Sequence, residues 1–167
     1  MLSSLSASGS EADQSLVLIS RSLEQTESIG SALGDILKPG DLLAVRGPLG
    51  AGKSALCRAV VRQMMREPGT EVPSPSYTLV NVYDAPNCEI WHADLYRLGD
   101  ESELHEIGLE DAVAQSVVLV EWPERWPNPP SRRLEISITP SPGEDRTLRV
   151  DAIGAWCEVI EWLERLQ

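Results

Sequence analysis

The chain contains 167 residues, the usual size of one domain with a modest hydrophobic core. Its 14 lysines and arginines are outnumbered by 26 aspartates and glutamates, so the net charge is −12. Such a surface repels a phosphate backbone, which argues against an extended nucleic-acid groove built by this chain alone. Apolar residues make up 42% and charged residues 24%, which excludes wholesale disorder. No apolar run approaches the ~20 residues that a membrane-spanning helix needs.

The cysteines and the N-terminal segment bear on where the protein works. The three cysteines, Cys57, Cys88 and Cys157, form no C-x-x-C pair, so we expect neither a disulfide framework nor a zinc site. Residues 1–14 are rich in serine, alanine and glycine, and they lack the basic and apolar regions of a secretory signal. We therefore expect a cytoplasmic protein with a disordered tail over residues 1–14 and a single domain over residues 15–167.

The first half of the chain alternates predicted strands with predicted helices. Ser22 and Gln25 have the spacing of a capping box, in which the two side chains satisfy free amides at a helix start. Lysine, proline and glycine at 38–40 end this helix. The elements predicted in this half are a strand over 16–19, the capped helix, a buried strand over 42–45 and an amphipathic helix over 54–66.

The second half of the chain begins with a proline-rich loop over 67–75. Near the C-terminus, apolar residues alternate with polar ones on both sides of a turn over 140–145, which predicts an antiparallel hairpin. The elements predicted here are strands over 79–82, 89–93 and 117–120, short helices over 101–107 and 110–114, hairpin strands over 134–138 and 148–150, and a closing helix that contains Trp156 and Leu163.

The segment from Gly47 to Ser54 matches the phosphate-loop pattern G-x-x-x-x-G-K-[ST]. Its glycines let consecutive N–H groups face a phosphate, and the helix that follows adds free amides and its positive dipole end. Lys53 can reach the β- and γ-phosphates, and Ser54 can offer its hydroxyl to Mg²⁺. An accidental glycine-rich turn is the alternative, but the strand before the loop and the helix after it favour phosphate binding. The pattern predicts an α/β, P-loop NTPase-like three-layer sandwich, with a mostly parallel central sheet and a C-terminal antiparallel hairpin.

Two carboxylates stand at predicted strand ends, where a P-loop enzyme needs an acid for Mg²⁺ and a group that orients the nucleophile. Asp94 follows the strand over 89–93, and Glu121 follows the strand over 117–120. The carboxyl ends of parallel strands meet at one edge of the sheet, beside the phosphate loop. The residues alone do not decide which acid touches the metal and which polarises water, and each has the alternative of being a solvated loop residue.

Three neighbouring features have both a functional and a structural interpretation. His92 shares a strand face with Asp94, so it can orient a carboxylate, although a lone strand histidine is more often a core residue. Arg97 can reach a phosphate or pair with a nearby acid, and His105 is expected on the surface. The hydroxyls of Ser76 and Thr78 occupy the place of a γ-phosphate-sensing switch, or they belong to an ordinary turn.

Four blocks in this order resemble the TsaE family, small P-loop ATPases of bacterial tRNA threonylcarbamoyladenosine (t6A) synthesis. The histidine-aspartate-arginine block and the glutamate-tryptophan pair that follow this phosphate loop make the resemblance specific. It covers roughly residues 16–150. The blocks are Gly47 to Ser54, Ser74 to Val80, His92 to Leu98, and Leu119 to Pro123.

The resemblance implies a Mg²⁺-dependent ATPase that supports the modification of an adenosine next to the tRNA anticodon. Proteins of this family do not transfer the threonylcarbamoyl group themselves. They dock on a heterodimer of two ASKHA-fold proteins, TsaD and TsaB, and their ATPase cycle resets that complex. We therefore expect ATP or ADP, Mg²⁺, TsaD and TsaB as partners, with no extended contact to tRNA and none to a membrane.

The resemblance also implies roles for individual residues. Lys53 binds the phosphates and belongs with Asp94 to the catalytic pair, in which Asp94 activates water or serves the switch. Ser54 and Glu121 hold Mg²⁺, with serine in place of the family's usual threonine. The nucleotide-binding set that it implies is Thr26, Gly47, Pro48, Leu49, Gly50, Ala51, Gly52, Lys53, Ser54, Ala55, Ser76 (also usually threonine), Trp122 and, on a weaker alignment, Arg146.

Two other functions remain open at the level of the sequence. A small-molecule P-loop kinase would carry an arginine-rich lid, and few arginines lie between Ser54 and Asp94. A nucleotide-gated binding module would need the bound nucleotide, with hydrolysis incidental. No internal arginine finger is recognisable, so we expect weak turnover alone and stimulation by the partner complex.

Overall fold

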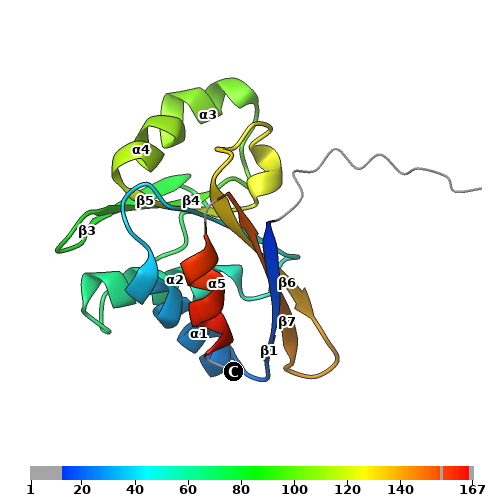
Figure 1. Ribbon diagram of the computed structural model, residues 1–167. Helices are drawn as coiled ribbons and strands as arrows, with labels where there is room; N and C mark the ends of the chain where they lie inside the picture. Colours follow the sequence, from blue (N-terminus) through cyan, green and yellow to red (C-terminus); the bar gives the residue numbers. More distant parts are fainter. Residues whose placement is uncertain (1–12, 155, 166–167) are drawn as a thin grey trace, which may run out of the picture.

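The computed structural model describes residues 13–154 and 156–165, and within them a seven-stranded sheet runs in the order β1-β7-β6-β2-β5-β4-β3 (Figure 1). The four central strands β6, β2, β5 and β4 are parallel to one another. At the edges, β3 pairs antiparallel with β4, and β7 pairs antiparallel with both β6 and β1. The strands are β1 (Gln14–Ser20), β2 (Leu42–Arg46), β3 (Val80–Asp84), β4 (Glu89–Asp94), β5 (Val117–Glu121), β6 (Arg133–Pro140) and β7 (Arg146–Ile153).

Helices cover the sheet from both sides and give the predicted three layers (Figure 1). Because side chains alternate along a strand, Leu43 and Leu119 face one apolar cluster, which includes α1, α2 and α5. Leu42 and Val120 face the other cluster, with α3 and α4. The helices are α1 (Leu23–Ile36), α2 (Lys53–Met65), α3 (Glu101–Ile107), α4 (Leu109–Gln115), α5 (Cys157–Glu164) and the short 3-10 turn η1 (Pro123–Arg125).

The local sequence signals act as predicted. Gln25 N–H donates to Ser22 Oγ at 3.1 Å, and the Gln25 side chain reaches back to the N–H of Arg21 at 2.7 Å. The hairpin of β6 and β7 is present, and it adds β1 at its outer edge. Of the tail predicted over residues 1–14, residues 1–12 lie outside the described part of the chain. Gln14 instead begins β1, because its backbone pairs with Ala152 of β7. Within the described residues, no helix is long and apolar enough to cross a bilayer.

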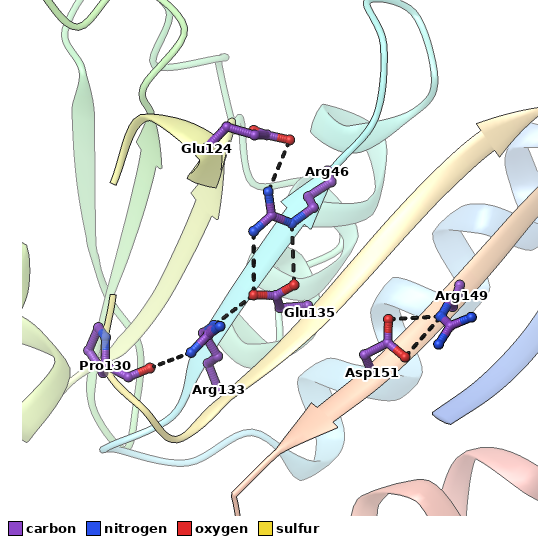
Figure 2. Close-up of polar contacts among 7 residues, drawn as sticks. All are labelled: Arg46, Glu124, Pro130, Arg133, Glu135, Arg149 and Asp151. Atoms are coloured by element: carbon purple, nitrogen blue, oxygen red, sulfur yellow. Dashed lines mark hydrogen bonds and ion pairs between the residues drawn. The ribbon is translucent and has the colours of Figure 1, made fainter. Parts of the chain in front are cut away.

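Charged side chains lie along β6 and β7 and the neighbouring end of β2, as drawn in Figure 2. Arg133 Nε donates to Glu135 Oε1 at 2.7 Å, and Arg46 Nε donates to Glu135 Oε2 at 3.3 Å. Arg46 also pairs with Glu124 of η1 at 3.3 Å. Since Arg46 ends β2 directly before the phosphate loop, this network connects the base of that loop to the segment that follows Glu121.

Replacing Glu135 should make stability less sensitive to acid. Burial opposes the shift, but hydrogen bonds from Arg133 and Arg46 lower the pKa of Glu135 below its usual 4.5. Its contribution is therefore complete above pH 4.5 and is lost as the pH falls through the folded-state pKa. We expect Glu135→Gln to cost about 1 kcal/mol of unfolding free energy at pH 7 and less below pH 4, measured by urea titration across pH. The exposed Glu144→Gln is the control; an equal cost of Glu135→Gln at every pH would contradict the expectation.

Candidate active site

The phosphate loop connects the carboxyl end of β2 to the start of α2. Gly47 has a φ of +149°, and a Cβ at this position would lie 2.8 Å from the Ile138 carbonyl oxygen, so a side chain does not fit there. Gly52 is the N-cap of α2, with a φ of +109°, and as a glycine it has no side chain to accept a hydrogen bond from the first turn. The helix start therefore presents amides and a positive dipole end to an anion.

Lys53 is held at the base of this loop and is only 5% exposed. Its Nζ donates to the carbonyl oxygens of Gly47 at 2.7 Å and Pro48 at 2.8 Å, and it lies 4.2 Å from the ring centre of Trp122. Burial lowers the pKa of Lys53, whereas the nearby carboxylates of Glu121 and Asp94 oppose that shift. The ammonium is thus bound by two carbonyl oxygens and by the face of an aromatic ring, within the loop that would bind phosphates.

Glu121 is fixed between the hydroxyl of Ser54 and the ring of His92. Ser54 Oγ donates to Glu121 Oε2 at 3.0 Å, and His92 Nε2 shares a hydrogen bond with Glu121 Oε1 at 2.8 Å. The parallel register of β4 and β5 sets Asp94 directly beside Glu121. Glu121 is 1% exposed, so both of its oxygens reach polar partners in a dry position. The same contact gives His92 the orienting position that the sequence left open.

Asp94 ends β4 and joins the loop that carries the predicted switch hydroxyls. Its Oδ1 accepts a hydrogen bond from the Tyr96 amide at 3.0 Å, and its Oδ2 accepts one from Ser76 Oγ at 3.2 Å. Thr78 Oγ1 instead donates to Asn81 at 2.8 Å, away from Asp94. Of the two hydroxyls considered from the sequence, the structure therefore brings only Ser76 to the carboxylate.

Thr26 and Arg146 come to the phosphate loop from two other elements. Arg146 Nε donates to the carbonyl oxygen of Ala51 at 2.8 Å. A Cβ at Gly52 would lie 3.4 Å from Arg146 Nε and 3.7 Å from a methyl carbon of Thr26. Thr26 is fully buried and shares a hydrogen bond with Ser20 Oγ at 2.8 Å. The pairing of β1 with β7 brings these two distant residues together.

Trp122 follows Glu121 in the left-handed region, with a φ of +58°. Its ring centre lies 4.8 Å from that of Tyr96, and Lys53 lies on its face. A tryptophan rarely takes this backbone conformation, which clusters at functional positions. Its ring also packs, partly buried, against the apolar cluster of α3 and α4, so the same side chain contacts both Lys53 of the phosphate loop and the core.

The remaining candidates lie in the phosphate loop itself, at the margin of this site or outside it. Leu49 projects from the loop apex and is 70% exposed. Arg97 lies 4.5 Å from the ring centre of Tyr77, a residue of the 74–78 loop. The acid considered as its partner from the sequence is not found among residues 13–154 and 156–165. His105 is exposed on α3, as expected. Pro48, Gly50, Ala51 and Ala55 lie in the loop and first turn where the pattern sets them.

Sequence reasoning missed two side chains that touch this site, Tyr96 and Cys57. Tyr96 packs against Trp122 with the two rings tilted by 44°, and its place in the block from His92 to Leu98 was the available signal. The thiol of Cys57 lies with His92 and Glu121 in one buried group. Its spacing of three residues from Ser54 on a helix could have indicated the shared face.

The donor set fits a nucleotide phosphate with Mg²⁺. The hydroxyl of Ser54 and the carboxylates of Glu121 and Asp94 offer the hard oxygen ligands that Mg²⁺ prefers. On the other side of the loop, Lys53 and Arg146 and the first amides of α2 offer donors to an anion. These groups are brought to one end of the phosphate loop although they come from four segments of the chain, α2, β4, β5 and β7.

Comparisons with known proteins bear on the family and the fold. A sequence profile described as "Threonylcarbamoyl adenosine biosynthesis protein TsaE" matches residues 20–148. The chain is 37% identical over 108 residues to the tRNA threonylcarbamoyladenosine biosynthesis protein TsaE of Rickettsia felis, covering 65% of this chain and 63% of that protein. The match thus spans slightly less than two thirds of that relative.

The Bacillus subtilis protein of the same description is 32% identical over 141 residues, which cover 82% of this chain and 85% of that protein. The crystal structure of Bacillus subtilis YdiB superposes with a TM-score of 0.73 at 26% identity, covering 92% of this chain and 94% of that chain. This likeness confirms the α/β fold that the sequence predicts.

Proposed function

This chain belongs to the TsaE family of threonylcarbamoyl adenosine biosynthesis proteins, and we propose that it is an ATP-binding and ATP-hydrolysing accessory subunit in that synthesis. The 3.0 Å contact between Ser54 Oγ and Glu121 Oε2, at the start of the helix that follows the phosphate loop, carries this proposal. A hydroxyl and a carboxylate held together there form the ligand pair expected for Mg²⁺ beside a triphosphate.

The nucleotide would be held by the loop from Gly47 to Ala55, with Thr26, Ser76, Trp122 and Arg146 around it. Mg²⁺, when bound with ATP, neutralises charge on the phosphate oxygens. Lys53 exchanges its bonds to the two loop carbonyls for bonds to phosphate, which its flexible stem allows. Most of the catalysis expected here is positioning and charge stabilisation.

Asp94 is proposed to orient the attacking water and accept its proton. The amide of Tyr96 and the hydroxyl of Ser76 hold the two oxygens of this carboxylate, so its direction is set before substrate arrives. Ser76 also connects Asp94 to the 74–78 loop, where a change in contact with the γ-phosphate would be transmitted. Glu121 keeps its second oxygen on His92, which fixes the metal-side carboxylate.

In the t6A pathway the protein is proposed to act on the TsaB–TsaD complex in the cytoplasm and not to transfer the threonylcarbamoyl group. Its net charge of −12 fits a subunit that leaves tRNA binding to its partners. An arginine supplied by the partner complex would complete the site, because Arg97, three residues after Asp94, is engaged with the ring of Tyr77.

The test measures ATP hydrolysis by the full chain alone and with purified TsaB–TsaD. We expect low turnover alone and at least about tenfold stimulation by the complex, a small part of what an arginine supplied in trans can give. In cells depleted of the protein, t6A should fall and be restored by the wild type but not by Glu121→Gln. Phosphorylation of a metabolite would indicate a kinase instead. Full restoration by a variant without turnover would indicate a nucleotide-gated binding module.

A further inference from the structure

A buried group of three different metal-ligating side chains lies behind the proposed magnesium position. Cys57 comes from α2, His92 from β4 and Glu121 from β5, and their ligand atoms all lie within 4.8 Å of one another. Exposure is 0% for Cys57 and 1% for both other residues. Ser54 stands one helical turn before Cys57, is partly exposed, and bonds to Glu121, so it connects this group to the phosphate loop.

The donor atoms of this group select a different class of metal from Mg²⁺. A thiolate, an imidazole nitrogen and a carboxylate oxygen suit Zn²⁺ and similar transition metals, whereas Mg²⁺ takes oxygen ligands. Tetrahedral Zn²⁺ with bonds of about 2.1 Å holds two ligand atoms about 3.4 Å apart. The observed separation of 2.8 Å between His92 Nε2 and Glu121 Oε1 would therefore widen by about 0.6 Å.

The imidazole of His92 has a second feature that matters here. Its Nδ1 is buried without a hydrogen-bond partner among the described residues, which is unusual for a native polar atom. In the absence of metal, the Glu121 carboxylate favours the tautomer with the proton on Nε2. A metal bound at Nε2 requires the proton on Nδ1 instead, and the cation then lies between the Nε2 lone pair and the carboxylate.

We propose that Cys57, His92 and Glu121 form an inhibitory site for Zn²⁺ or a similar transition metal. On binding, the S–H bond of Cys57 breaks, a sulfur–metal bond forms, and the proton leaves to solvent. The metal takes Glu121 Oε1, the oxygen that faces His92, so the carboxylate that bonds to Ser54 through its other oxygen is no longer free to serve as a ligand of Mg²⁺. The site itself follows from the side chains, whereas inhibition rests on the proposed function of Glu121.

The metal site is tested by titrating the full chain with Co²⁺ and following absorption, because a thiolate ligand gives a charge-transfer band in the near ultraviolet. We expect one Co²⁺ per chain with this band, and Zn²⁺ should abolish it by displacing cobalt. Cys57→Ser should lose the band and bind Zn²⁺ at least about 100-fold more weakly in calorimetry. Loss of a residue that only hydrogen-bonds to a metal ligand already lowers metal affinity by up to about 100-fold. Cys88→Ser, which changes a cysteine outside the group, should keep both.

Absence of the band in the wild type, or its persistence in Cys57→Ser, overturns the site. If Cys57→Ser does not fold, Cys57→Ala takes its place, and the wild-type band with its displacement by Zn²⁺ still decides whether a thiolate binds metal. Inhibition is tested separately. Zn²⁺ should lower ATP hydrolysis in the wild type and in Cys88→Ser but not in Cys57→Ser, and excess Mg²⁺ should weaken the effect. Zn²⁺ binding that leaves ATP hydrolysis unchanged, or inhibition that Mg²⁺ does not weaken, overturns the inhibitory role. If the chain binds the metal but never hydrolyses ATP, the result counts against the proposed function and not against the metal site.

Discussion

Lys53→Ala should bind ATP at least about 100-fold more weakly than the wild type. The ammonium already lies inside the phosphate loop, on the carbonyl oxygens of Gly47 and Pro48. Charge-assisted hydrogen bonds are worth about 1.5–3 kcal/mol each, and the loss of about 3 kcal/mol is a little over a hundredfold in affinity. Isothermal calorimetry with ATP and Mg²⁺ measures the difference directly.

The controls for this variant separate charge from folding. Lys38 is the other lysine of the chain and is exposed after α1, so Lys38→Ala should bind ATP like the wild type. Lys53→Arg keeps the charge but brings a planar group to a place where a compact ammonium fits between two carbonyls, and it should also bind weakly. The thermal unfolding temperature of each variant shows whether the substitution at the buried position has lowered the stability of the fold. Wild-type affinity in a folded Lys53→Ala would remove the phosphate-loop assignment.

The fold was predictable because its signals are local. The capping box of Ser22 and Gln25 and the alternating patterns of the C-terminal hairpin each need only a few neighbouring residues. The length of β1 was not predictable in this way, because its backbone pairs with β7, from Gln14 with Ala152 to Ser20 with Arg146, far along the chain. The residue at which a strand ends depends on its pairing partner, and the local sequence pattern of a strand does not identify that partner.

The site was predictable in its parts and not in its contacts. The pattern sets Lys53 and Ser54 on the loop, and strand ends give Asp94 and Glu121, but the register that sets these two acids side by side is a property of the sheet. Cys57 was missed because cysteine rules look for pairs of cysteines along the chain, whereas its partners come from β4 and β5. Distances across the sheet decide such groups, and only the folded chain has them.

Asp94→Asn should retain ATP binding and lose turnover by a factor of about 100 to 10,000, the usual contribution of a general base. Asparagine keeps the shape of the residue, and its carbonyl oxygen can still accept the hydrogen bond from the Tyr96 amide. Affinity for ATP should be equal or higher, because one negative charge near the phosphates is removed. Single-turnover hydrolysis with TsaB–TsaD present measures the chemical step, and the exposed Asp84→Asn at the end of β3 is the control.

The same experiment decides which acid touches the metal, a question that the residues alone leave open. Ser54 bonds to Glu121, whereas Asp94 bonds to Ser76 and Tyr96 on the other side. A metal ligand and a base differ in one measurable respect, the Mg²⁺ concentration at half-maximal rate. We expect Glu121→Gln to raise that concentration and Asp94→Asn to leave it unchanged while lowering the maximal rate. The opposite result would exchange the two roles, since the acid that sets the metal requirement must be the acid that holds the metal.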